Sequence, residues 1–218
     1  EFVKQIVKSA NQLDELEALN IDIVADISGS MDGSPLRQAK EIMTSFVNSI
    51  QFEAGDLVAL TTFSNGVYLD CAFTDNGQTV KNAIDRLVTY DMTALYDALY
   101  TSVNRVAAMQ GAKCVIAFTD GLDNYSNVSI YDVIELANRY RVPIFIIGVG
   151  SSNYSDVQYI ADQTGGRYYN ISSISDMSDI YKQIYRIEKE LYMIEFEDTS
   201  GIDLYDESSI VIGYHSQE

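Results

Sequence analysis

Ile21-Asp-Ile-Val-Ala-Asp-Ile27 is a short, mostly apolar stretch that leads directly into the polar sequence Ser28-Gly-Ser-Met31. An apolar run of this length, bounded by small polar residues, is typical of a strand that is buried on both faces. Beyond it, Pro35 suits the first turn of a helix and Ser34 suits its N-cap. Apolar residues then recur at helical spacing as far as Ile50. A buried strand followed at once by an amphipathic helix is the repeating unit of parallel sheets.

The same alternation of apolar runs and helix-like segments continues along the chain. We expect further strands at 56–63, 67–73, 113–118, 144–149 and 167–171, and further helices at 80–87, 95–109, 130–140, 156–163 and 176–190. Asn65-Gly66 is a hairpin signal, so the strand after it should run antiparallel to the strand before it. The alternation predicts an α/β fold, with a doubly wound, mostly parallel sheet and helices on both of its faces.

Both ends of the chain fall outside this alternation. We divide the chain into an N-terminal flank (1–19), a central α/β domain (20–190) and a C-terminal β extension (191–218). Within the extension, 191–197 and 209–214 look like two strands of a hairpin that could extend the sheet or belong to a neighbouring module. Residues 2–7 could form another strand. We interpret the chain as a piece of a longer protein.

The composition excludes several classes of function. The chain has 218 residues, enough for one domain with a substantial core, and a net charge of −18 from 14 Lys+Arg and 32 Asp+Glu. Such an acidic surface repels phosphate backbones and anionic lipids, so we expect neither nucleic-acid binding nor direct membrane insertion. His215 is the only histidine and lies near the C-terminal end, which leaves a Ser-His-Asp mechanism without its base.

Oxygen-bearing side chains occur where the expected strands end. Ligands of a doubly wound sheet bind beyond the carboxyl ends of its strands. The candidates there are Asp26, Ser28, Ser30, Thr93 and Asp120. Two carboxylates and three hydroxyls, without a nitrogen or sulfur donor, suit Mg²⁺, Mn²⁺ or Ca²⁺ rather than zinc. For the first three residues taken alone, an ordinary turn that caps a helix is the alternative.

The pattern Asp26-x-Ser28-x-Ser30, followed by Thr93 and then Asp120-Gly121, resembles the metal-ion-dependent adhesion site of von Willebrand factor type A domains. The resemblance covers roughly residues 20 to 190. It implies that the three hydroxyls coordinate a single divalent cation, while the two aspartates act directly or through water. In this family an open coordination position accepts a carboxylate from a protein ligand. The expected cofactor is Mg²⁺, with Mn²⁺ or Ca²⁺ as alternatives.

The resemblance also implies a six-stranded sheet in the order 3-2-1-4-5-6, with one antiparallel edge strand. The hairpin at Asn65-Gly66 would supply that strand. Because Cys71 and Cys114 fall on strands that are not neighbours in this order, we expect two buried free thiols rather than a disulfide.

One segment departs from the family pattern. The family usually has glycine just before the threonine, where this chain has Asp91-Met92. The additional carboxylate could change the preference for metals or disfavour acidic ligands. Two further aspartates near this edge of the sheet, Asp32 and Asp123, are interpreted as solvated loop charges.

These observations favour a non-enzymatic, cation-dependent protein-binding module of the adhesion type, whose metal accepts an acidic group from a protein ligand. The alternatives are a partner-recruiting subunit of an intracellular complex and a Mg²⁺-dependent phosphoryl-transfer hydrolase. The hydrolase is disfavoured because no P-loop is present and Ser28 stands where aspartyl-phosphate phosphatases need a second aspartate. We expect an extracellular or cell-surface location, as part of a larger protein, with an intracellular one as the alternative.

Overall fold

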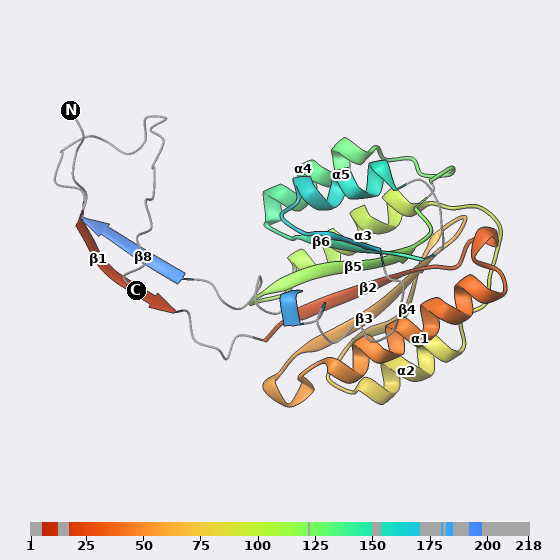
Figure 1. The fold of residues 1–218 in the computed structure, drawn as a ribbon, viewed down its shortest axis with the longest axis horizontal. Helices are drawn as coiled ribbons and strands as arrows, with labels where there is room; N and C mark the ends of the chain where they lie inside the picture. The colour runs from red at the N-terminus through yellow and green to blue at the C-terminus, as the bar shows by residue number, and fades with distance from the viewer. Residues whose placement is uncertain are drawn as a thin grey trace. The chain divides into compact units, whose positions relative to one another are not determined.

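The computed structural model describes residues 6–12, 18–121, 123–149, 154–170, 180, 182–184 and 192–197, with the first and last of these ranges described as backbone only. The chain divides into two compact units (Figure 1). One unit comprises Asp14–Glu190, and the other combines Glu1–Leu13 with Leu191–Glu218.

The larger unit is built on a six-stranded sheet with the strand order β4-β3-β2-β5-β6-β7. Its strands are β2 (Asn20–Asp26), β3 (Leu57–Phe63), β4 (Val67–Thr74), β5 (Lys113–Thr119), β6 (Ile144–Gly148) and β7 (Tyr168–Asn170). Numbered from β2 along the chain, the order is 3-2-1-4-5-6. Only the β3–β4 pair is antiparallel among these described strands. The predicted doubly wound sheet with one antiparallel edge strand is therefore confirmed.

Helices cover both faces of this sheet (Figure 1). They are α1 (Ser34–Ser49), α2 (Gly77–Asp85), α3 (Leu95–Ala107), α4 (Ile130–Tyr140) and α5 (Ser155–Gln163), with short 3₁₀ turns η1 (Gly29–Met31) and η2 (Phe52–Ala54). The first two α-helices pack on one face, and α3, α4 and α5 pack on the other. Within the described residues, no helix combines the length and the hydrophobicity that crossing a bilayer requires.

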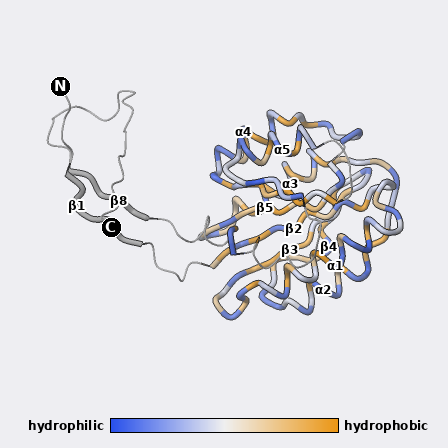
Figure 2. Tube along the Cα trace, viewed as in Figure 1, coloured by the Kyte–Doolittle hydropathy of each residue, from blue (hydrophilic) through white to orange (hydrophobic). Residues whose placement is uncertain are grey.

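β2 is buried over its whole length, which explains why four of its seven residues are apolar and why its polar residues need hydrogen-bond partners. Successive side chains of a strand point to opposite faces of the sheet. Accordingly, Ile21 and Ile23 belong to the core beneath α1 and α2, whereas Val24 belongs to the core beneath α3 and α4. Figure 2 shows the hydrophobic residues concentrated in these central strands. The central strand is thus fixed in register by two cores at once.

Two local predictions need correction or lie outside the described residues. Ser34 is not the N-cap of α1: Gly33 occupies that position with φ of 77°, and Ser34 is the first helical residue. A glycine allows the left-handed backbone with which the chain leaves η1. Most of the expected helix at 176–190 lies outside the described residues, although 180 and 182–184 are helical. Cys71 and Cys114 are both buried and free, as predicted.

The smaller unit contains one pair of antiparallel strands among its described residues. β1 (Ile6–Gln12) pairs with β8 (Tyr192–Glu197), and the register runs from Ile6 opposite Glu197 to Gln12 opposite Tyr192. β8 matches the strand expected at 191–197, and β1 overlaps the one considered at 2–7. The strand expected at 209–214 lies outside the described residues, so the C-terminal hairpin stays a prediction.

An ion pair between the buried Asp22 and the partly exposed Arg105 joins β2 to α3. Asp22, which is fully buried, accepts hydrogen bonds from Arg105 Nη1 at 2.7 Å and from Thr61 Oγ1 at 2.8 Å. Burial raises the pKa of the Asp22 carboxyl, and the Arg105 guanidinium opposes that rise. Removing Arg105 would leave the Asp22 charge buried and uncompensated, which destabilises the folded state.

We therefore expect Arg105→Met to lower the free energy of unfolding by about 3–5 kcal/mol at neutral pH. The double variant Asp22→Asn/Arg105→Met should lose clearly less, because no buried charge remains. Urea unfolding followed by circular dichroism measures both. Arg139→Met is the control, since Arg139 pairs with Glu135 on the exposed face of α4 and should matter little. A double variant as unstable as Arg105→Met would contradict this account.

Candidate metal centre

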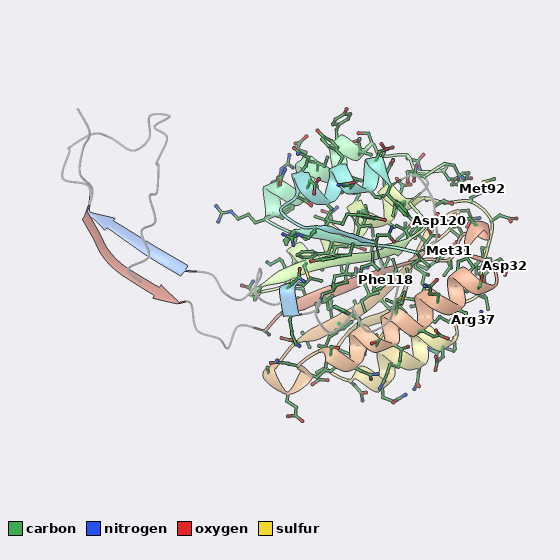
Figure 3. The ribbon with its side chains drawn as sticks, in the orientation of Figure 1. Met31, Asp32, Arg37, Met92, Phe118 and Asp120 are labelled. Carbon is green, nitrogen blue, oxygen red and sulfur yellow. The ribbon has the colours of Figure 1, made fainter. Side chains whose placement is uncertain are left out.

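The predicted site residues lie at the carboxyl ends of two neighbouring strands. β2 and β5 are parallel, and Asp26 ends β2 while Asp120 directly follows β5. Ser28 and Ser30 come next in the chain after Asp26, in the turn that leads to α1. Thr93 lies just before α3. Figure 3 shows Asp120, Met31 and Met92 at the same end of the sheet.

Four of the five predicted ligands are almost fully buried. Asp26 and Ser28 are each 1% exposed, Thr93 is 4% exposed and Asp120 is 6% exposed, whereas Ser30 is exposed. The Ser28 amide donates to Asp26 Oδ1 at 2.9 Å, and the hydroxyls of Ser28 and Ser30 lie 3.0 Å apart. The structure therefore brings the first three residues into direct contact.

Thr119 connects this cluster to Asp120, and the sequence analysis missed it. Its hydroxyl donates to Asp26 Oδ2 at 2.6 Å and accepts from the Gly121 amide at 3.0 Å. The side chain is fully buried. A threonine at a strand end is unremarkable by itself, and only the pairing of β5 with β2 reveals that it faces the neighbouring aspartate.

Two residues of the loop after Asp120 hold the Thr93 segment in place. Asn124 Oδ1 accepts from the Thr93 amide at 3.0 Å, and the Thr93 carbonyl accepts from the Asn124 amide at 3.0 Å. Asp123 Oδ1 accepts from the Leu95 amide at 2.8 Å, at the beginning of α3. The interpretation of Asp123 as a solvated charge was therefore wrong. It caps a helix that begins 28 residues earlier in the chain.

The end of β3 also supports Thr93. The amide of Ala94, the next residue, donates to the carbonyl of Ser64 at 2.8 Å, and Ser64 directly follows β3. On the other side, the Tyr90 amide donates to the Ile27 carbonyl at 2.7 Å. The segment 90–94 is thus tied to β2, to β3 and to the loop after β5, which brings Thr93 to the edge where Asp26 and Asp120 lie.

The two carboxylates of the site are buried and close enough to interact. Burial raises the pKa of Asp26 to about 6, hydrogen bonds from Ser28 and Thr119 oppose that rise, and the charge of Asp120 adds to it. Asp120 Oδ1 is buried and has no hydrogen-bond partner among the described residues. A buried carboxylate oxygen without a partner costs free energy, which a bound cation would remove.

The donor set fits a hard cation that is bound largely through hydroxyls. Among the described residues, no group of three or more His, Cys, Asp or Glu side chains lies where it could hold a metal ion. A cation at this edge would therefore depend on the hydroxyl oxygens of Ser28, Ser30 and Thr93 as well as on the two aspartates. Mg²⁺, Mn²⁺ and Ca²⁺ accept such oxygen ligands.

Met92 stands where the resembling family usually has glycine, and its backbone adopts a conformation that glycine favours. Its φ is 65°, in the left-handed region that L side chains rarely adopt, and its side chain is 50% exposed. The preceding Asp91 is exposed, and its Oδ1 lies 3.6 Å from the position that a Cβ would take on Gly29. The departure from the pattern therefore adds backbone strain and a carboxylate at the rim of the site.

Comparison with known proteins identifies a family whose sequence pattern this chain shares. The family model for the von Willebrand factor type A domain matches residues 20–183. An uncharacterised protein of Synechocystis, sll0103, is 24% identical over 187 residues, which is 83% of this chain and 44% of that protein. The chain spans less than two thirds of the first curated relatives that it matches.

Solved structures share the fold at low sequence identity. The protein BatB of Bacteroides thetaiotaomicron superposes with a TM-score of 0.65 at 18% identity, covering 78% of this chain and 98% of BatB. The vWF domain of the type V pili tip protein Mfa5 of Porphyromonas gingivalis has a TM-score of 0.63 at 12% identity, covering 78% of this chain and 94% of that domain. These superpositions show that both proteins share the arrangement of strands and helices of this chain.

The buried carboxylate predicts a particular pH dependence in the metal-free protein. Folding raises the pKa of Asp26 from 3.8 to about 6, so the folded protein binds a proton at Asp26 more tightly than the unfolded chain does. The stability that this proton contributes is therefore fully present below pH 3.8 and is lost as the pH rises to about 6. The free energy of unfolding of Asp26→Asn, minus that of the wild type, should therefore increase by about 3 kcal/mol over this range and then level off.

Urea unfolding in EDTA at a series of pH values measures this difference. Asp32→Asn, at an exposed carboxylate near the same edge, supplies the baseline. A difference between Asp26→Asn and the wild type that does not change with pH would be incompatible with a buried, destabilised carboxylate.

Met92→Gly should raise the free energy of unfolding by about 0.5–1 kcal/mol. The substitution removes the strain of a left-handed residue, and this gain exceeds the entropy that glycine adds to the unfolded chain. Thermal or urea unfolding measures it. Asp91→Gly is the matched control, because among described non-glycine residues only Met92 and Arg141 have positive φ. Equal effects of the two substitutions would argue against strain at Met92.

Proposed function

Because the chain belongs to the von Willebrand factor type A domain family, we propose that it is a non-enzymatic, adhesion-type module that binds a protein ligand through a divalent cation. Domains of this family are generally protein-interaction modules. The proposed ligands of the cation are Asp26, Ser28, Ser30, Thr93 and Asp120.

The observation that carries this proposal is the unsatisfied Asp120 carboxylate. Its Oδ1 is buried without a hydrogen-bond partner among the described residues, and its charge helps to raise the pKa of the buried Asp26. Two buried carboxylates that interact unfavourably are a costly arrangement for a purely structural role. A cation held between them and the neighbouring hydroxyls explains why both are present.

The proposed ligands have different roles in such a site. Asp26 and Asp120 supply the negative charge that retains the cation, while the three hydroxyls add ligands without adding charge. Thr119 and the Ser28 amide orient Asp26 by hydrogen bonds at 2.6 Å and 2.9 Å. When bound, the cation supplies a local positive charge that can accept an acidic side chain, although the chain as a whole carries a net charge of −18.

We place this activity at the cell surface, in a longer protein. The support is the likeness of the fold to the vWF domain of a type V pili tip protein, together with the 44% coverage of the Synechocystis relative. In that setting the acidic body of the domain would keep anionic molecules away, and attraction would be confined to the metal. Because salt screens this long-range repulsion more than the short contact between the metal and a carboxylate, binding of an acidic protein segment should strengthen as moderate salt is added.

Isothermal titration of the chain with Mg²⁺ should detect a single site in the wild type and none in Asp120→Ala or Ser28→Ala. Mn²⁺ and Ca²⁺ should compete for the same site, since they share its preference for oxygen ligands. Asp32→Ala, which removes an exposed carboxylate outside the proposed ligand set, is the control and should retain the site.

Circular dichroism of each variant checks that the loss of binding is not a loss of folding. Absence of uptake of all three ions by the wild type at millimolar concentration would overturn the proposed mechanism. Retention of the site in Asp120→Ala would overturn the proposed ligand set.

A further inference from the structure

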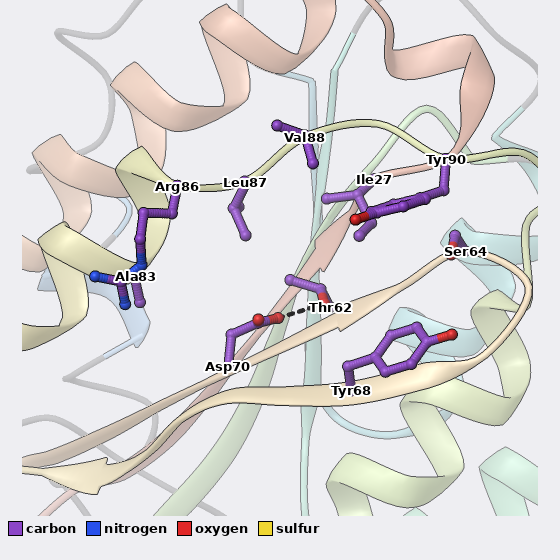
Figure 4. A pocket seen from close by; sticks show the side chains of 10 residues that line it. All are labelled: Ile27, Thr62, Ser64, Tyr68, Asp70, Ala83, Arg86, Leu87, Val88 and Tyr90. Carbon is purple, nitrogen blue, oxygen red and sulfur yellow. Dashed lines mark hydrogen bonds between the residues drawn. The ribbon is translucent and has the colours of Figure 1, made fainter.

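A pocket opens next to the segments that carry the proposed metal ligands. It has a volume of about 360 Å³ and lies between β3, β4, the end of α2 and the segment leading to Tyr90 (Figure 4). This volume falls in the range of pockets that accept small ligands or single side chains. Ile27, which lines it, stands between Asp26 and Ser28, and Ser64, which also lines it, accepts the hydrogen bond that fixes Ala94 next to Thr93.

Exposed apolar side chains concentrate around this pocket. Nine large hydrophobic side chains are exposed among the described residues, and three of these border the pocket from β4 and from the segment after α2. They are Tyr68, Val88 and Tyr90, and each is more than half exposed. Such a gathering on an otherwise acidic surface is a feature of interaction sites.

The pocket has an apolar floor and polar groups at one end. Its floor includes Ile27, Ala83 and Leu87, which are almost fully buried. Its polar groups include the Asp70 carboxylate, which accepts a hydrogen bond from the Thr62 hydroxyl, as Figure 4 shows.

Arg86 adds a positive charge to the same pocket. Its guanidinium is exposed, and among the described residues no carboxylate forms an ion pair with it. In a chain with 32 acidic and 14 basic residues, a cation left unpaired at a pocket wall is available to a ligand. A guanidinium can lie over an aromatic face or donate a hydrogen bond to an oxygen of the ligand.

We propose that this pocket binds a tyrosine side chain of the same protein ligand whose acidic residue contacts the metal. The ring of a tyrosine suits the apolar floor and the Tyr68 and Tyr90 walls, while its hydroxyl suits Asp70 and Arg86. Ile27 lies between Asp26 and Ser28 in the chain and its carbonyl accepts from the Tyr90 amide, so the proposal takes one extended segment to reach both the pocket and the metal. The two-residue description of the ligand rests on the proposed function, whereas the pocket's affinity for a tyrosine side chain does not.

The first measurement isolates the pocket from the metal. N-acetyl-tyrosinamide, which has no carboxylate, is titrated into the ¹⁵N-labelled chain in EDTA, with N-acetyl-alaninamide as the control compound. We expect the tyrosine compound alone to shift the amide resonances of Ile27, Val88 and Tyr90. Tyr68→Ala should abolish these shifts, and Tyr131→Ala should not, because Tyr131 is 68% exposed on α4 and does not line the pocket.

The second measurement tests whether one peptide contacts both the metal and the pocket. Acetylated peptides in which tyrosine follows aspartate, directly or after a short glycine spacer, are compared with peptides that carry alanine in place of tyrosine, in the presence of Mg²⁺. At one spacing the tyrosine peptide should bind about tenfold more tightly or better, the affinity gained by burying an aromatic side chain. Tyr68→Ala should remove this gain without changing the affinity for the alanine peptide.

The measurements distinguish a pocket that does not bind tyrosine from a metal site that does not bind an acidic residue. Equal affinities of the tyrosine and alanine peptides at every spacing, or no shifts with N-acetyl-tyrosinamide, would overturn the pocket while leaving the Mg²⁺ titration intact. If no acidic peptide binds but N-acetyl-tyrosinamide still shifts the pocket resonances, the metal contact fails and the tyrosine pocket stands.

Discussion

The hydrogen bond from the Thr119 hydroxyl to Asp26 is the contact on which the functional edge of this protein depends. It joins the end of the central strand to the end of its neighbour at 2.6 Å, inside a buried environment. Because Thr119 also accepts from the Gly121 amide, one hydroxyl fixes both the Asp26 carboxylate and the loop that carries Asp120. This link relates the two buried carboxylates that lie at the ends of adjacent strands.

The sheet makes that contact possible by holding β2 between two cores. The strand has α1 and α2 on one face and α3 on the other, and it is paired on both sides by parallel neighbours. Three loops therefore leave the sheet at one edge. Backbone bonds from Tyr90 to Ile27 and from Ala94 to Ser64 then draw the segment before α3 to the same edge. The pocket lined by Tyr68 and Tyr90 follows from that arrangement, because its walls are the same tied segments.

The candidate site shows how far sequence patterns reach. Asp26, Ser28 and Ser30 are neighbours in the chain, so their contact could be anticipated from spacing alone. The support of Thr93 by Asn124, and the capping of α3 by Asp123, could not be anticipated in that way. Each joins residues about 30 positions apart, and no local propensity encodes such a pairing. The same holds for Asp22, whose charge in an apolar strand is explained only by Arg105 in a distant helix.

The sequence by itself determined the alternation of strands and helices, the antiparallel strand after Asn65-Gly66 and the group of oxygen-bearing side chains at the strand ends. These features depend on periodicity, turn residues and short spacings, which act over a few neighbouring positions. Tertiary structure decided which side chains meet: Thr119 with Asp26, Asp123 with the start of α3, and Tyr68 with Tyr90 around a pocket. It also decided that Met92 takes a left-handed backbone, because hydrogen bonds on both sides of it fix the path of the chain. Those outcomes come from strand order and burial, which only the folded chain possesses.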